Sequence, residues 1–407
     1  MASTSRLALG TLLALGTASI VATAPASAKS YSGPVLSKSE RAALSALETA
    51  LNARNYPAAN AALAPAQAAA QSADARFYLA GLQLRLGRET ANTALQASAI
   101  DALVASGRVP AAEQGALYAT QGALATFAGK RDRAEAALTR AYELSPTAET
   151  ALALAQLKLD RRKNAEALPL IDRAISLRKA AGQPVPESWY RRGVNVATIA
   201  NATPEVLKFS RELVAAYPSE KNWRDTILLY RDFAKPDQAA TLDAERLLRL
   251  SRALAGERDY LEAAQAFESA NLSGEAQSVF QEGVAAKMVD PAKASFKEAI
   301  ATSTKRAGAA KAKLAGLRTA AASAATGTAA LTAGDQHLSF GDYAAAAELY
   351  RAALTKSGVD TATANTRLGI ALALAGRRAE ADAAFRAVTG PRADLASLWL
   401  VWLGQRA

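Results

Sequence analysis

His337 is the chain's only histidine, and so the side chain best suited to move a proton near neutral pH. A catalytic histidine needs a nucleophile and an orienting group within hydrogen-bond reach. Its neighbours in the sequence, Asp335 and Asp342, are each explained by helix-capping or turn chemistry. We therefore interpret His337 as a residue that lines a groove or packs in a core, and we predict that the chain is not an enzyme.

Ligands for metal ions and phosphate groups are scarce in the sequence. There is no cysteine, which excludes thiolate ligands and cysteine nucleophiles, and there is no dense cluster of aspartate and glutamate. The pattern G-x-x-x-x-G-K-[ST], whose backbone cradles nucleotide phosphates, does not occur. We predict no catalytic residue, no cofactor and no metal ion.

The formal net charge is +11, and a segment from Lys287 to Arg318 is strongly basic. Its only acids are Asp290 and Glu298, and its apolar residues are sparse. Such a run is usually a solvated helix. The alternative is an electrostatic patch that binds an anionic component of the cell envelope. The cations of this candidate patch are Lys287, Lys293, Lys297, Lys305, Arg306, Lys311, Lys313 and Arg318.

The N-terminus has the composition of a leader. Arg6 precedes the apolar run 7–21, and Ala26-Ser27-Ala28 matches an A-x-A cleavage site. The run is too short and too soon interrupted for a membrane-spanning helix, which disfavours an uncleaved anchor. We expect a signal peptide over 1–28, cut after Ala28, a flexible start over 29–35, a periplasmic location and no transmembrane segment in the mature chain.

Two near-copies of one pattern lie between residues 331 and 388. Each begins with a glycine, Gly334 or Gly369, and has another glycine seven positions later, an alanine twelve later and an aromatic residue sixteen later. The matching residues are Gly341, Ala346 and Tyr350 in the first copy and Gly376, Ala381 and Phe385 in the second. A small residue lets two helices cross closely, and the aromatic ring then fills the space beside the crossing.

This pattern resembles the tetratricopeptide repeat (TPR), a pair of antiparallel helices with a period near 34 residues. The resemblance is also strong at 118–146, with Gly122 and Leu138, and at 189–218, with Gly193 and Phe209. Aromatic residues that precede a glycine by four positions fit buried repeat cores better than a stacking platform for sugars or bases. These aromatics are Phe77, Tyr118 and Trp189.

The resemblance implies an all-α solenoid of stacked helix pairs, because one pair cannot bury a core alone. We expect a partly degenerate array over 36–318, a small-residue linker or hinge over 319–329, and two repeats with a capping helix over 330–407. In the TPR family, groove contacts come from the first helix of each repeat. Carried over, this points to Asn195, Gln336, His337, Asn365 and Arg367 as partner-binding residues.

The sequence thus favours an exported bacterial TPR-containing scaffold that holds another envelope protein or peptide in its concave groove, without chemistry of its own. The alternative is an accessory protein that binds acidic glycan or lipid head groups, or assists polysaccharide export, through the basic segment 287–318. Nucleic acid would fit the charge, but a periplasmic location argues against it.

Overall fold

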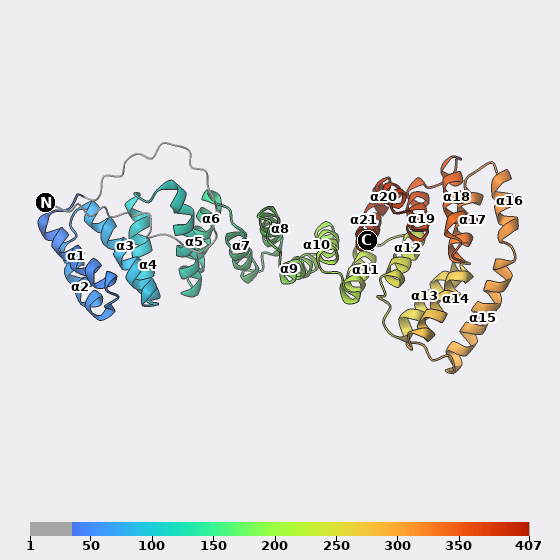
Figure 1. The fold of residues 1–407 in the computed structure, drawn as a ribbon, viewed down its shortest axis with the longest axis horizontal. Coiled ribbons are helices and arrows are strands. Elements are labelled where there is room, and N and C mark those ends of the chain that lie inside the picture. The colour runs from blue at the N-terminus through green and yellow to red at the C-terminus, as the bar shows by residue number, and fades with distance from the viewer. Residues whose placement is uncertain (1–34, 407) are drawn as a thin grey trace. The chain divides into compact units, whose positions relative to one another are not determined.

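A computed structural model describes residues 35–406 of the chain, so the predicted leader and nearly all of the predicted flexible start lie outside the described residues. The described part contains helices α1 to α21 and no strand, which confirms the all-α prediction (Figure 1). The chain divides into two compact units, one ending at Val185 and one beginning at Pro186. We call them unit 1 and unit 2.

Unit 1 consists of four antiparallel helix pairs. Its helices are α1 (Lys38–Asn52), α2 (Tyr56–Ala69), α3 (Ala73–Glu89), α4 (Thr93–Ser106), α5 (Ala111–Phe127), α6 (Arg131–Leu144), α7 (Ala148–Asp160) and α8 (Asn164–Ala180). The two helices of each pair pack against each other, and each pair also contacts the next pair along the chain. This is the stacking that a solenoid requires, since no pair has a core of its own.

A left-handed residue at the same place sets the tight turn inside every pair of unit 1. The residue has a positive φ in each case, and it is Arg54, Ala91, Gly129 or Arg162. Only one of these four is a glycine, so three pairs accept a conformation that costs a side chain about 1 kcal/mol. The helix packing on both sides of the turn must supply that free energy.

Unit 2 contains the remaining helices. They are α9 (Glu187–Ile199), α10 (Thr203–Ala216), α11 (Glu220–Ala234), α12 (Gln238–Leu250), α13 (Glu257–Ser269), α14 (Ser273–Ala285), α15 (Ala294–Lys311), α16 (Leu314–Ser323), α17 (Thr328–Ser339), α18 (Tyr343–Leu354), α19 (Thr361–Leu374), α20 (Arg378–Arg386), the short η2 (Gly390–Arg392) and α21 (Ala393–Gly404). One hydrophobic core runs from α10 to α21.

The predicted close helix crossings are present in both units. A Cβ atom added to Gly334 would lie 2.6 Å from the Tyr350 ring, and one added to Gly369 would lie 2.5 Å from the Phe385 ring. The same relation holds between Gly193 and Phe209 at 2.7 Å. In unit 1 Leu138 approaches Gly122 in the same way, at 2.5 Å. The glycines are therefore needed for space, because real Cβ atoms do not approach neighbours so closely.

The C-terminal helix α21 does more than cover the last repeat. It packs on α20, as a capping helix should, and it also contacts α10 and α12, which lie far earlier in the chain. Both of its tryptophans are buried, and Trp399 stacks on Phe385 with ring centroids 5.8 Å apart. Gln405 accepts a hydrogen bond from the Trp223 indole at 3.1 Å and donates one to the Val214 carbonyl at 2.7 Å. The C-terminal end of unit 2 therefore packs back on helices from earlier in the same unit.

The predicted linker over 319–329 contains the end of α16 and the start of α17. Lys356 donates hydrogen bonds to the carbonyl groups of Ala321 at 2.9 Å and Ala324 at 2.7 Å, and Gly327 donates to Ser357 at 2.9 Å. The segment is therefore held against the loop after α18. A hinge at 319–329 stays a prediction.

Across residues 35–406, no helix combines the length and the apolar character that a membrane span requires.

Candidate partner-binding surfaces

The five residues predicted to line a groove lie in different environments. Asn195 on α9 is exposed, and Asn365 on α19 is partly exposed. Gln336 on α17 is partly exposed and donates a hydrogen bond to the Asn271 carbonyl at 3.0 Å. His337 and Arg367 are buried and bonded within unit 2. The structure does not gather the five into one surface, and their role in binding a partner stays a prediction.

His337 lies in the last turn of α17. Its Nδ1 atom is 2.8 Å from Oδ2 of Asp342, and its Nε2 atom has no hydrogen-bond partner among the described residues. Asp342 also accepts a hydrogen bond from the backbone of Ala345 as the N-cap of α18. The histidine therefore joins the end of one helix to the start of the next, which agrees with a packing role.

Arg367 belongs to a buried ion-pair network that the sequence analysis did not predict. Its centre is Asp243 on α12, whose exposed fraction is 0%. Asp243 accepts hydrogen bonds from Arg246 at 2.5 Å, from Arg392 at 3.1 Å and from Arg367 at 3.4 Å. Because these three arginines come from α12, η2 and α19, one carboxylate joins the middle of unit 2 to its C-terminal end. We call this set the Asp243 network.

Two further acids balance the charge of the Asp243 network, Glu275, which is buried, and Asp335, which is partly exposed. Arg246 donates two hydrogen bonds of 2.7 Å to Glu275 on α14, and Arg367 donates one of 2.6 Å to Asp335 on α17. Tyr350 also donates to Asp335, at 2.8 Å. Burial raises the pKa of the Asp335 carboxyl despite the opposing effect of the arginines, and it raises the pKa of Tyr350 well above its usual value. Fully paired, such charges are tolerated in a core, whereas one unpaired charge is costly.

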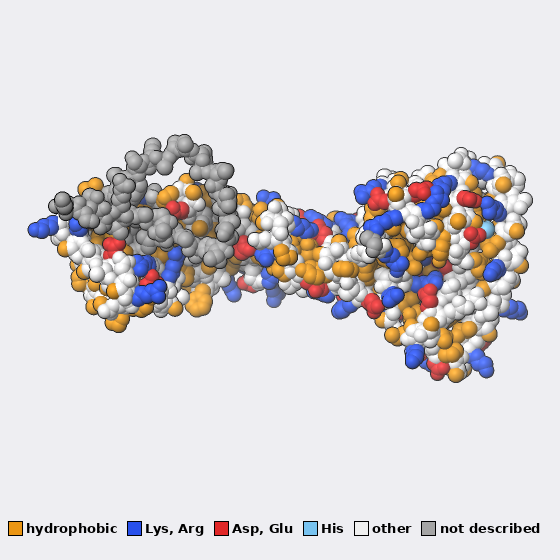
Figure 2. Space-filling model, viewed as in Figure 1, with side chains coloured by type: hydrophobic (Ala, Val, Ile, Leu, Met, Phe, Trp, Pro, Cys, Tyr) orange, Lys and Arg blue, Asp and Glu red, His pale blue; other side chains and the backbone are white. Residues whose placement is uncertain are grey.

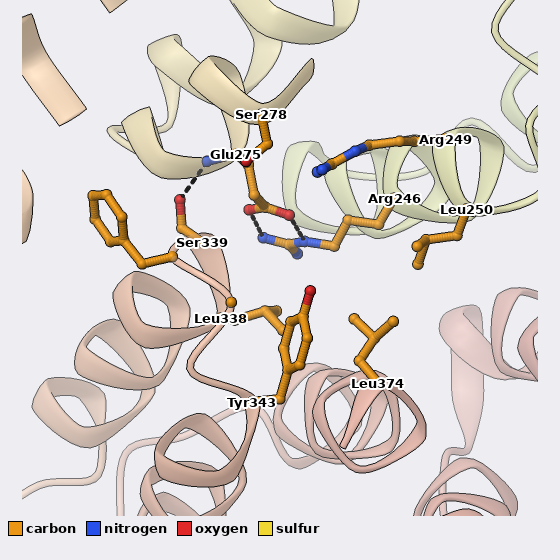
Figure 3. A pocket seen from close by; sticks show the side chains of 11 residues that line it. Arg246, Arg249, Leu250, Glu275, Ser278, Leu338, Ser339, Tyr343 and Leu374 are labelled. Carbon is orange, nitrogen blue, oxygen red and sulfur yellow. Dashed lines mark hydrogen bonds and ion pairs between the residues drawn. The ribbon is translucent and has the colours of Figure 1, made fainter. Parts of the chain in front are cut away.

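A recess of about 110 Å³ lies beside this network, between α12, α14, α19 and the α17–α18 turn (Figure 3). Arg246 and Arg249 meet Leu250, Leu338 and Leu374 there. The hydroxyl end of Tyr343 is directed toward the Arg246–Glu275 pair (Figure 3). Arg249 is itself engaged, through two hydrogen bonds to Glu282 at 2.6 and 2.7 Å. Small-molecule sites are commonly about 300–1,000 Å³, so this recess is small for a substrate or cofactor.

A different kind of surface covers the outward side of α5 in unit 1. Ala112, Ala116, Ala119, Ala123 and Phe127 are spaced by three or four positions and therefore share one side of the helix. Ala119 is partly exposed and the other four are exposed, with Phe127 at 80%. The opposite side of α5 carries the repeat's buried residues. We call the outward residues the α5 face.

The aromatic residues that precede the repeat glycines are buried or partly buried. Phe77 is buried against Ile100 and Leu103, while Tyr118 and Trp189 are partly buried. This agrees with the core interpretation and leaves no row of exposed rings.

The basic segment is ordered, and its eight cations are all exposed. It covers the loop after α14, the whole of α15 and the first half of α16. Phe296, Ser303 and Ala307 bury one side of α15. Among residues 35–406, no group of three or more His, Cys, Asp or Glu side chains is arranged to hold a metal ion.

Comparison with known proteins finds no matching protein family and no matching curated protein. Among solved structures, the chain is similar to the pilF protein of Pseudomonas aeruginosa, with 16% identity over 49% of this chain and 97% of the other, at a TM-score of 0.25. It is also similar to a tetratricopeptide repeat protein of Parabacteroides merdae, with 16% identity over 64% and 99% of the two chains, at a TM-score of 0.26.

A third similar chain comes from the structure of Naa15/Naa10 bound to HypK-THB. The identity is 11%, the match covers 79% of this chain and 63% of the other, and the TM-score is 0.31. Because all three identities and scores are low, the assignment depends on the repeats themselves. Three features support a TPR-like fold: the stacked helix pairs, the left-handed turns and the glycine–aromatic crossings. The chain is a TPR-like repeat protein.

Proposed function

We propose that this protein is a non-catalytic scaffold of the bacterial periplasm and that it binds a partner protein on the first helices of its repeats. The observation that carries the proposal is the α5 face, an apolar helix side over which no helix of residues 35–185 is packed. TPR-like stacks present such first helices along one surface, and extended surfaces of this kind hold other proteins. The buried network of unit 2 serves its own fold instead.

The composition of the α5 face indicates how a partner would bind. The four alanines allow the backbone of another helix to approach closely, and Phe127 offers a rigid aromatic group at one end. Exposed aromatic side chains are typical anchors of protein interfaces. No charged residue lies in this row, so binding through it depends little on ionic strength. An amphipathic helix of the partner protein would fit this face.

The periplasmic part of the proposal comes from the sequence. The apolar run 7–21 and the A-x-A site at Ala28 support export and cleavage. N-terminal sequencing of the protein purified from a bacterial envelope fraction tests this step. A first residue of Lys29 supports it, and an intact N-terminus in the cytoplasmic fraction contradicts it.

Affinity capture from an envelope extract tests the scaffold itself. We compare the unchanged chain with Phe127→Asp, and use Leu144→Asp as the matched control because Leu144 is also an exposed apolar residue of unit 1, at 36%, but lies at the end of the second helix α6. We expect one protein to be retained in high salt by the unchanged chain and by the control, and to be lost by Phe127→Asp. Equal retention by all three chains would contradict binding at the α5 face.

A further inference from the structure

The helices α15 and α16 break the repeat pattern of unit 2. The other pairs fold back on themselves, whereas α15 packs on α14 and α16 packs on α17, with only Ala312 and Lys313 between them. Figure 1 shows the two helices following one another along one margin of unit 2. We call residues 287–323 the basic edge. It forms a long, continuous surface, since 18 residues of α15 alone span about 27 Å.

The positive charge of the basic edge is largely unneutralised. Three of its cations have ion-pair partners: Lys293 pairs with Glu257, Arg306 with Glu268, and Arg318 with Glu348. The other five have no ion-pair partner among the described residues, and they are Lys287, Lys297, Lys305, Lys311 and Lys313. No acid occurs between Glu298 and Asp335. Figure 2 shows blue side chains projecting from this margin of unit 2.

Several cations form a row along α15. Lys293 is followed after four positions by Lys297, and steps of seven then lead to Thr304 and Lys311. Residues at these intervals share one side of a helix. That side lies next to the buried face, so it remains open to solvent while α15 stays fixed on α14. A row of this kind matches a linear chain with repeated negative charges better than a single small anion.

The types of side chain exposed on the basic edge indicate which class of partner would bind there. Met288 is its only exposed large hydrophobic residue, so the edge lacks the bulky apolar groups with which a helix enters a membrane surface. It exposes no aromatic ring on which nucleic-acid bases would stack. Protein interfaces are depleted in lysine and enriched in aromatic residues, whereas the basic edge exposes several lysines and no aromatic ring. Lysines interspersed with exposed Thr302 and Thr304 instead suit a hydrated, hydroxyl-rich polyanion.

We propose that the basic edge binds a linear acidic polysaccharide. Its lysines contact the repeated anionic groups, and the small residues between them let the sugar chain lie close to the helix. The interaction is electrostatic and therefore weakens steeply as salt screens it. The basic edge and the α5 face consist of different residues, so a negative result for one proposal leaves the other unaffected.

The test measures binding of the purified full chain to polygalacturonate, a linear polysaccharide with one carboxylate per sugar. In one variant the five unpaired lysines of the basic edge become glutamine. In the matched control, Lys38, Arg41, Arg54, Lys130 and Arg131 become glutamine; these five cations are exposed, lie in unit 1 and have no ion-pair partner among residues 35–406. Both variants lose five positive charges. A difference in their binding therefore reports where the lost charges lie on the protein and not how many were lost.

We expect the edge variant to bind more than about tenfold more weakly, with the control nearly unchanged, because each lysine near a polyanion contributes independently. Circular dichroism checks that both variants keep their helices. Equal losses in the two variants, or no loss in the edge variant, would overturn the proposal. Tighter binding of poly-L-glutamate, or of vesicles of equimolar phosphatidylglycerol and phosphatidylcholine, would also overturn it, in favour of an acidic peptide or a lipid surface.

Discussion

Replacing Asp243 by asparagine should destabilise unit 2 strongly. The substitution keeps the size of the side chain and removes its charge. Asp243 is fully buried and accepts hydrogen bonds from Arg246, Arg367 and Arg392. In the native protein these three buried arginines face three acids: Asp243 and Glu275 are buried, and Asp335 is partly exposed. The variant leaves the three cations with only Glu275 and Asp335, and Arg392 keeps only partners that are more than half exposed.

The expected cost is about 3–5 kcal/mol, the usual range when one partner of a buried ion pair is removed. For a unit of this size we take an m-value of about 2–3 kcal/mol/M, so the urea midpoint should fall by about 1–2 M. Asparagine can still accept a hydrogen bond, which places the expected cost toward the lower end of the range.

Tryptophan fluorescence reports this transition cleanly. The chain has four tryptophans, Trp189, Trp223, Trp399 and Trp402, and all lie in unit 2. The matched control is Glu262→Gln, which breaks the exposed pair with Arg258 and should cost less than about 0.5 kcal/mol. A midpoint shift in Asp243→Asn no larger than that of the control would show that the Asp243 charge is not needed to pair the buried arginines. Combining Asp243→Asn with Arg392→Met should recover part of the loss, because the unpaired cation is then removed.

Three further predictions concern packing, pH and closure. Gly369→Ala should destabilise unit 2 by about 1–3 kcal/mol, because the added Cβ would meet the Phe385 ring. Gly308→Ala on α15 should stabilise unit 2 by about 0.5–1 kcal/mol, because no atom lies within 4 Å of the added Cβ. Urea unfolding compares the two variants, and equal changes in the free energy of unfolding would contradict the close crossing at Gly369. The Ser72 and Ser37 backbone N–H groups lower the pKa of Glu40 from 4.5 to about 2, so its stabilisation of unit 1 is present above pH 4.5 and lost as the pH falls toward 2. The difference in thermal midpoint between the unchanged chain and Glu40→Gln, followed by circular dichroism, should shrink over that range, and a constant difference would argue against it. Gln405→Ala should cost unit 2 about 1–2 kcal/mol, because the Trp223 indole and the Val214 carbonyl lose their partner; a change in urea midpoint within error would contradict the closing role of Gln405.

The repeats were predictable because their pattern is local. A glycine and an aromatic residue sixteen positions later report one helix crossing, and the sequence shows Gly334 with Tyr350 and Gly369 with Phe385 directly. Helical spacing also places the residues of the α5 face on one side of the helix, although this face was not predicted from the sequence. Spacing cannot tell whether another helix covers an apolar side, and that information comes only from the fold.

The Asp243 network was not predictable in the same way. Its pairs join residues far apart in sequence, such as Asp243 with Arg392, and no spacing rule relates them. One signal was present: Asp243 and Arg246 lie within a run of buried positions that includes Ala244 and Leu247, where charges are unexpected. Arg367, predicted to contact a partner from its place on a first helix, is bonded inside unit 2 because the C-terminal helices return to α12, and its role in binding a partner stays a prediction.

The most direct test of the scaffold is photo-crosslinking in intact cells. A benzophenone amino acid replaces Phe127 at the end of the α5 face, and in a separate chain it replaces Leu144, an exposed residue at the end of α6. We predict one adduct of defined mass at position 127 and none at position 144. Adducts of equal yield at both positions, or none at position 127, would contradict the claim that the first helix of this repeat holds a partner protein.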